Sequence, residues 1–191
     1  LLEKAISVST DSIFHFAAIV SAGAEKDFDL GMSVNLDATR AILDICRGHE
    51  TKPKLIFASS CAAFGGEMPN IIADMTARTP QTSYGTQKVI GELLVNDYSR
   101  KGFVDGRALR FPTVVVRPGK PNKAASTFAS SIIREPLQGQ TAICPVSPES
   151  KMFLASPRSI IENVVRAHNL IEDDWGQSRE VTLPGFSMSI K

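Results

Sequence analysis

Short, uninterrupted apolar runs separate the amphipathic segments of this chain. The first run covers residues 13–18, after a polar stretch at 9–12, and the second covers 54–59. Runs of this length and composition are typical of strands that are buried on both faces of a sheet. A third β-rich stretch at 109–116 is interrupted by Pro112. We therefore expect at least three strands, with shorter ones at 141–146 and 180–183.

Three other segments repeat apolar residues every three or four positions and predict helices. They cover 35–49, 83–101 and 157–171. Gly48 and Gly102 are plausible ends for the first two, and Ser156 followed by Pro157 is a typical helix start. Residues 1–9 resemble the end of a helix, and the polar, glycine-containing stretch 21–31 predicts a loop.

Strands therefore alternate with helices, which predicts an α/β fold with a parallel sheet covered by helices on both faces. In such sheets, ligands bind beyond the carboxyl ends of the strands. Functional residues are then expected after Phe16, Ala58 and Phe111. The chain begins at Leu1 without a methionine, and we expect it to be an internal piece of a longer protein.

Composition narrows the classes of function. The 191 residues are 43% hydrophobic and 21% charged, with a net charge of +1, so we expect one globular domain that binds neither nucleic acid nor anionic lipid. No apolar run approaches the roughly 20 residues of a membrane span. Cys46, Cys61 and Cys144 lie far apart and outside metal-binding spacings. They predict buried thiols in a reducing, cytoplasmic compartment and no metal site.

Tyr84 and Lys88 lie four residues apart on one predicted helix, and hence on one helix face. A nearby ammonium favours the phenolate and lowers the pKa of a tyrosine. The pair would then serve as an acid and base at an alcohol oxygen. The alternative is a tyrosine packed under a lysine stem, because such spacing is common by chance.

Ser59 and Ser60 follow the second apolar run, at the end of a predicted strand. By themselves they are consistent with simple turn or helix-cap chemistry. One loop of about two dozen residues separates them from Tyr84, which is enough to return the chain to the same sheet edge. The serine pair at a strand end, followed by the tyrosine and lysine on one helix, indicates an active site more specifically than either pair alone.

Four segments at these positions resemble the extended short-chain dehydrogenase/reductase family, which includes the NAD-dependent sugar epimerases and dehydratases. They are 14–18 (FHFAA), 35–39 (NLDAT, with Ala38 in place of the usual glycine), 59–65 (SSCAAFG) and 110–113 (RFPT). The resemblance implies a Rossmann-like, doubly wound parallel sheet with a dinucleotide cofactor. His15 is expected to pack within its strand.

The resemblance also implies roles for individual residues. Tyr84 would be the catalytic base, Lys88 would hold the ribose and lower the pKa of that tyrosine, and Ser60 would hydrogen-bond the reacting oxygen. Asn35 would either border the cofactor or support the site structurally. The expected cofactor-binding residues are Phe16, Ala17, Ala18, Asn35, Ala58, Ser59, Tyr84, Lys88, Pro112 and Thr113.

One element of the family pattern is missing. None of the 13 glycines forms the G-x-x-G-x-x-G phosphate turn, so the first βαβ unit is expected to be absent from this chain. The residue that selects NAD over NADP is missing with it. NAD is the expected cofactor, and NADP stays open. We expect residues 1–118 to be the rest of the dinucleotide-binding domain and 119–191 to be a small substrate-side part interleaved with the sheet.

Two differences argue against nucleotide-sugar substrates. Cys61 and Ala62 stand where the family's dehydratases carry two carboxylates, and Thr113 stands where many sugar-nucleotide enzymes carry asparagine. Four segments (82–88, 117–122, 134–137 and 155–159) instead resemble family members that oxidise a four-carbon sugar acid. The expected substrate contacts are Ser60, Arg117, Lys120, Asn122 and Arg158, with Lys123 and Ser126 as weaker candidates.

Several alternatives remain. The cations at 117–123 would bind a carboxylate or phosphate, or they would form a solvated basic loop. The chain would belong to a sugar-acid dehydrogenase, to an epimerase with the same three catalytic residues, or to a non-catalytic dinucleotide-binding regulator. We also expect a homodimer formed by the helices at 35–49 and 83–101, as in relatives.

Overall fold

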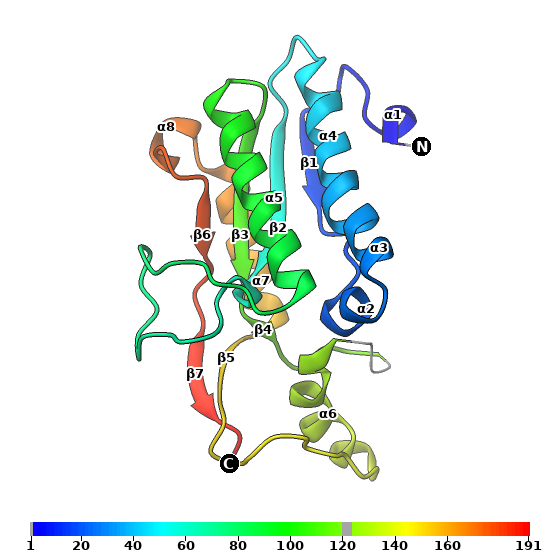
Figure 1. Cartoon of the computed structure of the whole chain (residues 1–191), viewed down its shortest axis with the longest axis vertical. Coiled ribbons are helices and arrows are strands. Elements are labelled where there is room, and N and C mark those ends of the chain that lie inside the picture. Colours follow the sequence, from blue (N-terminus) through cyan, green and yellow to red (C-terminus); the bar gives the residue numbers. More distant parts are fainter. Residues whose placement is uncertain (1, 120–123) are drawn as a thin grey trace.

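The computed structural model describes residues 2–119 and 124–191, and its centre is a parallel sheet. The sheet has four strands in the order β1, β2, β3, β6 (Figure 1). Their bounds are β1 (Ser12–His15), β2 (Lys54–Ser60), β3 (Asp105–Phe111) and β6 (Glu180–Thr182). Every pairing in it is parallel. The expected α/β fold with a parallel sheet is confirmed.

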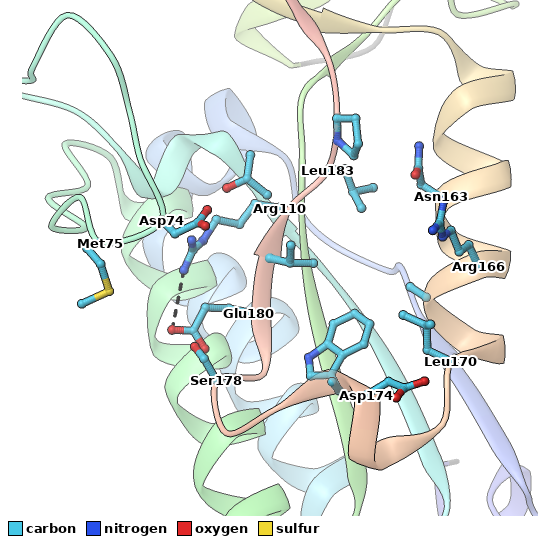
Figure 2. Close-up of a pocket in the computed structure, with 15 residues that line it drawn as sticks. Asp74, Met75, Arg110, Asn163, Arg166, Leu170, Asp174, Ser178, Glu180 and Leu183 are labelled. Carbon is cyan, nitrogen blue, oxygen red and sulfur yellow. Dashed lines mark ion pairs between the residues drawn. The ribbon is translucent and has the colours of Figure 1, made fainter.

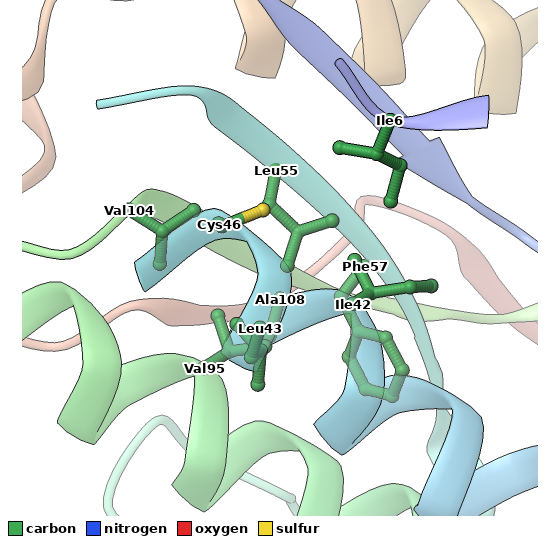
Figure 3. Close-up of a cluster of buried hydrophobic side chains, with 9 residues drawn as sticks. All are labelled: Ile6, Ile42, Leu43, Cys46, Leu55, Phe57, Val95, Val104 and Ala108. Carbon is green, nitrogen blue, oxygen red and sulfur yellow. The ribbon is translucent and has the colours of Figure 1, made fainter. Parts of the chain in front are cut away.

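Helices cover both faces of this sheet. Helices α4 (Ala38–Arg47) and α5 (Ser83–Arg100) lie in front of the strands in Figure 1, and α7 (Pro157–Asn169) lies behind them. Side chains of β2 alternate accordingly: Leu55 and Phe57 belong to the cluster under α4 and α5, and Ile56 belongs to the cluster under α7. The first cluster includes Ile42 and Val95, which point at Phe57 and its neighbours in Figure 3. A continuous apolar run was therefore a correct signal for a strand buried on both faces.

The stretch 21–31 is helical, so the expected loop was wrong. The chain forms α1 (Leu2–Ala5), then α2 (Ser21–Lys26), α3 (Phe28–Gly31) and a π-helical turn at Met32–Asp37 that leads directly into α4. Asp27 begins α3 by accepting a hydrogen bond from the backbone N–H of Leu30, at 3.0 Å. Ala24 is fully buried. Small, polar residues here serve helix capping and close packing rather than a loop.

A second, smaller sheet extends beyond the carboxyl end of β3. Its order is β4, β5, β7, with β4–β5 parallel and β5–β7 antiparallel. In Figure 1 this sheet and α6 lie below the main sheet. The strands of this sheet are β4 (Thr113–Val114), β5 (Lys151–Ala155) and β7 (Phe186–Ser189), and α6 covers Phe128–Arg134. Elsewhere, α8 (Glu172–Trp175) precedes β6, and 3-10 turns lie at Cys61–Ala63, Ala125–Thr127 and Pro136–Gln138.

The strand expected at 141–146 does not form, and the strand of this region is β5 instead. Ile143 is 81% exposed, so its apolar neighbours are not part of a core. Cys144 is exposed with it, and Cys61 is half-buried, so the expectation of buried thiols holds only for Cys46. None of the described helices is both long and apolar enough to cross a membrane.

Candidate active site

A cavity of about 580 Å³ opens at the carboxyl ends of β1, β2 and β3. This is the sheet edge at which parallel α/β folds bind ligands. Residues from all three strand ends, from the start of α5 and from the segment after β4 line it. Among the residues predicted from sequence, those that line it are Phe16, Ala18, Ala58, Ser59, Ser60, Tyr84, Lys88, Pro112, Thr113, Arg117 and Ser126.

The end of β2 and the start of α5 meet at this cavity. Ser60 begins the 3-10 turn Cys61–Ala63 by accepting a hydrogen bond from the backbone N–H of Ala62, at 3.1 Å. A Cβ atom at Gly85 would lie 2.3 Å from the carbonyl oxygen of Ala62. Only glycine allows this approach, which sets Tyr84 beside Ser60. Ser60 therefore both caps the 3-10 turn and lines the cavity.

Tyr84 is half-buried, and its environment shifts its pKa upward. Burial is the largest cause, and the hydroxyl of Ser60 acts in the opposite direction by hydrogen bonding. The pKa of Tyr84 is therefore raised overall and not lowered as expected, because removal of the phenolate from water outweighs the opposing effects. The Lys88 Nζ lies 5.6 Å from the centre of the Tyr84 ring.

Lys88 is 1% exposed, and its Nζ also lies 4.7 Å from the centre of the Phe57 ring. Burial lowers the pKa of this lysine to about 8, and the charge of Glu92 opposes that shift. The ammonium thus has two ring contacts. Within residues 2–119 and 124–191 it makes no hydrogen bond, although it borders the cavity. A buried ammonium without a hydrogen-bond acceptor is suited to bind a ligand that offers acceptor oxygens.

Asn35 and His15 lie beneath the cavity rather than on its lining. The Asn35 amide accepts from the Ile19 N–H at 2.8 Å and donates to the Ile19 carbonyl at 2.9 Å and to Gln87 Oε1 at 2.7 Å. Asn35 thereby joins the segment after β1 to α5. These bonds correspond to the second of its two expected roles, structural support of the site. His15 Nε2 lies 2.8 Å from Thr39 Oγ1. Burial and the charge of Lys88 lower the pKa of His15 to about 4, so its imidazole is neutral near pH 7.

The predicted substrate contacts fall in three different places. Arg117 lines the cavity, and its carbonyl accepts a hydrogen bond from Arg134 Nη1 at 2.7 Å. Arg158 does not line the cavity; it is exposed and pairs with Glu162 at 2.9 Å. Lys120, Asn122 and Lys123 lie outside the described residues. Ala17, an expected cofactor contact, is exposed and is not part of the lining.

Sequence reasoning missed a buried charged cluster behind the cavity. Glu92 is fully buried and accepts hydrogen bonds from Ser59 Oγ at 2.5 Å and from Arg110 Nε and Nη2, both at 2.8 Å. Arg78 adds a fourth donor at 3.1 Å. Glu92 follows Lys88 by four residues, as Lys88 follows Tyr84. That spacing was the signal that Glu92 shares their inward face.

A second cavity of about 550 Å³ lies beyond Arg110. Figure 2 shows Arg110 directed toward Glu180, which is 3.9 Å away, with Arg166 of α7 and Leu170, just after this helix, on the opposite wall. Trp175 forms part of the lining, and the ring also lies 5.2 Å from the Arg107 guanidinium. Asp74 and Asp174 line this cavity at exposed positions. The described residues hold no cluster of three or more metal-ligating side chains.

Comparison with known proteins places this geometry in a family. Residues 1–152 match the model of the NAD dependent epimerase/dehydratase family. D-erythronate dehydrogenase from Cupriavidus necator is 55% identical over 99% of this chain, and D-erythronate dehydrogenase from Haemophilus influenzae is 55% identical over all of it. The chain spans 58% and 60% of the length of these two relatives.

Solved structures agree with the sequence relatives. The nucleoside-diphosphate-sugar epimerase from Agrobacterium tumefaciens matches with a TM-score of 0.93 and 47% identity, over 99% of this chain and 56% of that one. L-threonine dehydrogenase from Phytophthora infestans matches with a TM-score of 0.86 and 26% identity, over 94% of this chain and 58% of that one. The chain belongs to the NAD-dependent epimerase/dehydratase family, the extended short-chain dehydrogenases/reductases that its sequence resembles.

Proposed function

We propose that the protein to which this chain belongs is an NAD-dependent dehydrogenase that oxidises a secondary hydroxyl of a small sugar acid, D-erythronate, to a 2-oxo-tetronate. The observation that carries the proposal is the convergence of Ser60, Tyr84 and Lys88 on one cavity at the strand ends. Two relatives at 55% identity named D-erythronate dehydrogenase support the choice of substrate.

In this proposal, the three residues handle the proton of the substrate hydroxyl. Tyr84 Oη accepts the proton as the carbon is oxidised, and Ser60 Oγ hydrogen-bonds the same oxygen in both oxidation states. Because burial raises the pKa of Tyr84, its phenolate needs a compensating positive charge. Lys88 is the cation beside it, and it stabilises the phenolate when charged.

The nicotinamide and ribose of a dinucleotide would bind in the same cavity. Ala18 and Ala58 leave room along the strand ends, and the buried ammonium of Lys88 has unused donors that ribose hydroxyls would accept. Ser59, Pro112, Thr113 and Phe16 would complete the contact. The bound nicotinamide would accept the hydride from the substrate carbon. We propose NAD rather than NADP from the family, and titration with both nucleotides tests that choice.

The substrate carboxylate would bind a cation on the far side of the cavity. Arg117 is the described residue in that position, and its planar guanidinium fixes the rotation of a carboxylate. Lys120 and Asn122 follow it in sequence and belong to the same proposal. Arg158 is the remaining candidate. In this scheme residues 119–191 form the substrate-side part of the molecule.

We propose a cytoplasmic homodimer, with α4 and α5 at the two-fold axis. Leu93 of α5 is 51% exposed and Phe28, next to these helices, is 58% exposed, which leaves apolar surface for a self-complementary contact. Light scattering across micromolar concentrations should give twice the mass of one subunit. A monomeric mass throughout this range would contradict the dimer.

A sugar epimerase is the second candidate, because the solved structure with a TM-score of 0.93 carries that name. The two functions are separated by assaying the whole protein with NAD against D-erythronate, the neutral polyol erythritol and a nucleotide sugar. We expect the absorbance of reduced nicotinamide to rise with D-erythronate only. Interconversion of the nucleotide sugar without net reduction would contradict the dehydrogenase and favour the epimerase.

A further inference from the structure

Glu92 is the most completely bonded charge near the candidate site, yet it does not border the cavity itself. Its two carboxylate oxygens accept from Ser59, Arg110 and Arg78, and its side chain is fully buried. Ser59 is the neighbour of Ser60 at the end of β2 and is 3% exposed. A charge-assisted bond of this kind holds a strand end more firmly than a neutral one.

We propose that Glu92 is a positioning residue for the candidate active site: it holds the end of β2 through Ser59 and presents its negative charge to Lys88, one turn away on α5. The proposal rests on the proposed function for its effect on turnover. Its effect on Lys88 stands apart from that function.

The geometry gives Glu92 two separate effects. Through Ser59 it fixes the backbone from which Ser60 projects, and a misplaced hydroxyl loses alignment with the reacting oxygen. Through its charge it acts on Lys88, which is also faced by His15 from β1 and by Tyr84 from its own helix. Arg110, from β3, is bonded to Glu92. Among these groups Glu92 is the one that favours the ammonium.

The protonation of Lys88 is finely balanced. Burial lowers the pKa of this lysine to about 8, and Glu92 acts against that shift. Without the carboxylate, the pKa of Lys88 falls further, because its burial remains and Arg110 keeps only the more distant carboxylate of Glu180, at 3.9 Å. The ammonium would then be lost closer to neutral pH, and with it the stabilisation of the Tyr84 phenolate.

Glu92→Gln is the main test, because it removes the charge and keeps the shape. Lysine labelled with ¹³C at Cε reports the protonation of Lys88 by NMR, and its signal is identified by its loss in Lys88→Met. We expect a midpoint near 8 in the unmodified protein, and a midpoint lower by about half a pH unit or more in Glu92→Gln. An unchanged midpoint in the folded variant would overturn the electrostatic role.

Two further variants separate the effects. Ser59→Ala removes the hydrogen bond between Glu92 and β2 and keeps the charge of Glu92. We therefore expect kcat to fall about tenfold and KM for the sugar acid to change less than about twofold. The Lys88 midpoint should stay in place. Asp97→Asn is the control on the same helix: its carboxylate pairs with Arg100 at the surface, and its loss should change none of kcat, KM and the Lys88 midpoint.

The outcomes also distinguish this proposal from the proposed function. If the unmodified protein reduces no NAD with any sugar acid, the function fails, and the Lys88 midpoint still decides the role of Glu92. If it is active and Ser59→Ala keeps full kcat, the positioning role is overturned. Should Glu92→Gln not fold, Ser59→Ala alone decides the positioning role, and Glu92→Asp, which keeps the charge, should retain the midpoint near 8; a lower midpoint there contradicts the proposal.

Discussion

The two cavities have nearly the same size, about 580 and 550 Å³, and one buried ion pair separates them. Ser59 lines the first, Arg110 lines the second, and both are bonded to Glu92. In the first, Lys88 is buried and its pKa is shifted to about 8. In the second, Arg166 and Asp174 are exposed to solvent. Burial of reactive groups, rather than volume, distinguishes a candidate catalytic site.

The largest effect is expected from the first cavity. Tyr84→Phe removes the proton acceptor and keeps the ring that packs near Lys88, so folding should be preserved. We expect kcat for sugar-acid oxidation to fall by about 10³-fold, measured from the rate of nicotinamide reduction. Near-normal turnover in this variant would show that Tyr84 is not the base.

The ion pair of Arg110 and Glu92, which lies between the two cavities, should have the largest effect on the free energy of unfolding. Arg110→Met leaves the buried carboxylate of Glu92 with fewer donors, and breaking such a pair costs about 3–5 kcal/mol of unfolding free energy. Arg158→Met removes a solvent-exposed pair with Glu162, which should change the unfolding free energy far less, because water and salt screen exposed charges. Urea denaturation measures both, and equal costs would contradict the importance of burial.

Beneath the first cavity, His15 should make stability depend on pH. Its pKa in the folded protein is about 4, below the ordinary 6.5, so the unfolded chain takes up the proton first. Stability from this group is therefore complete above pH 6.5 and is lost as the pH falls toward 4, by about 3 kcal/mol. The pH dependence of urea unfolding should be weaker by this amount in His15→Asn. An identical pH dependence would contradict the shift.

The smallest effect is expected in the second cavity. Arg166→Gln changes an exposed side chain that no described hydrogen bond uses, so kcat/KM should stay within about twofold and unfolding free energy within about 0.5 kcal/mol. The same assays apply as for Tyr84→Phe and Arg110→Met. A loss comparable with either of those would show that the second cavity takes part in the reaction.

The main sheet and the candidate site followed from patterns that are local in sequence. The run at 54–59 and the helical repeat at 83–101 predicted β2 and α5 because packing on both sheet faces requires those periodicities. Ser60, Tyr84 and Lys88 line one cavity, as expected for the carboxyl ends of parallel strands. Their catalytic roles remain proposals.

Other features depend on partners that are distant in sequence. β3 begins at Asp105, four residues before the expected apolar stretch, because Asp105 is buried where it pairs with the distant Arg179 at 3.2 Å. Glu92 was not singled out from the sequence, because its partner Arg110 lies on β3, outside the helix that carries Glu92. The run at 141–146 is apolar without a surface to pack on. The start of β3 and the burial of Glu92 both depend on ion pairs between different segments. The sequence of one segment alone does not predict such pairs.

A crystal structure of the whole protein with NAD and D-erythronate would show directly where the cofactor and the substrate bind. We predict that the nicotinamide and the sugar acid share the first cavity, with the reacting hydroxyl within hydrogen-bond distance of Ser60 Oγ and Tyr84 Oη, and Lys88 Nζ on the ribose. Density for the sugar acid in the second cavity, beside Arg110 and Trp175, would contradict it.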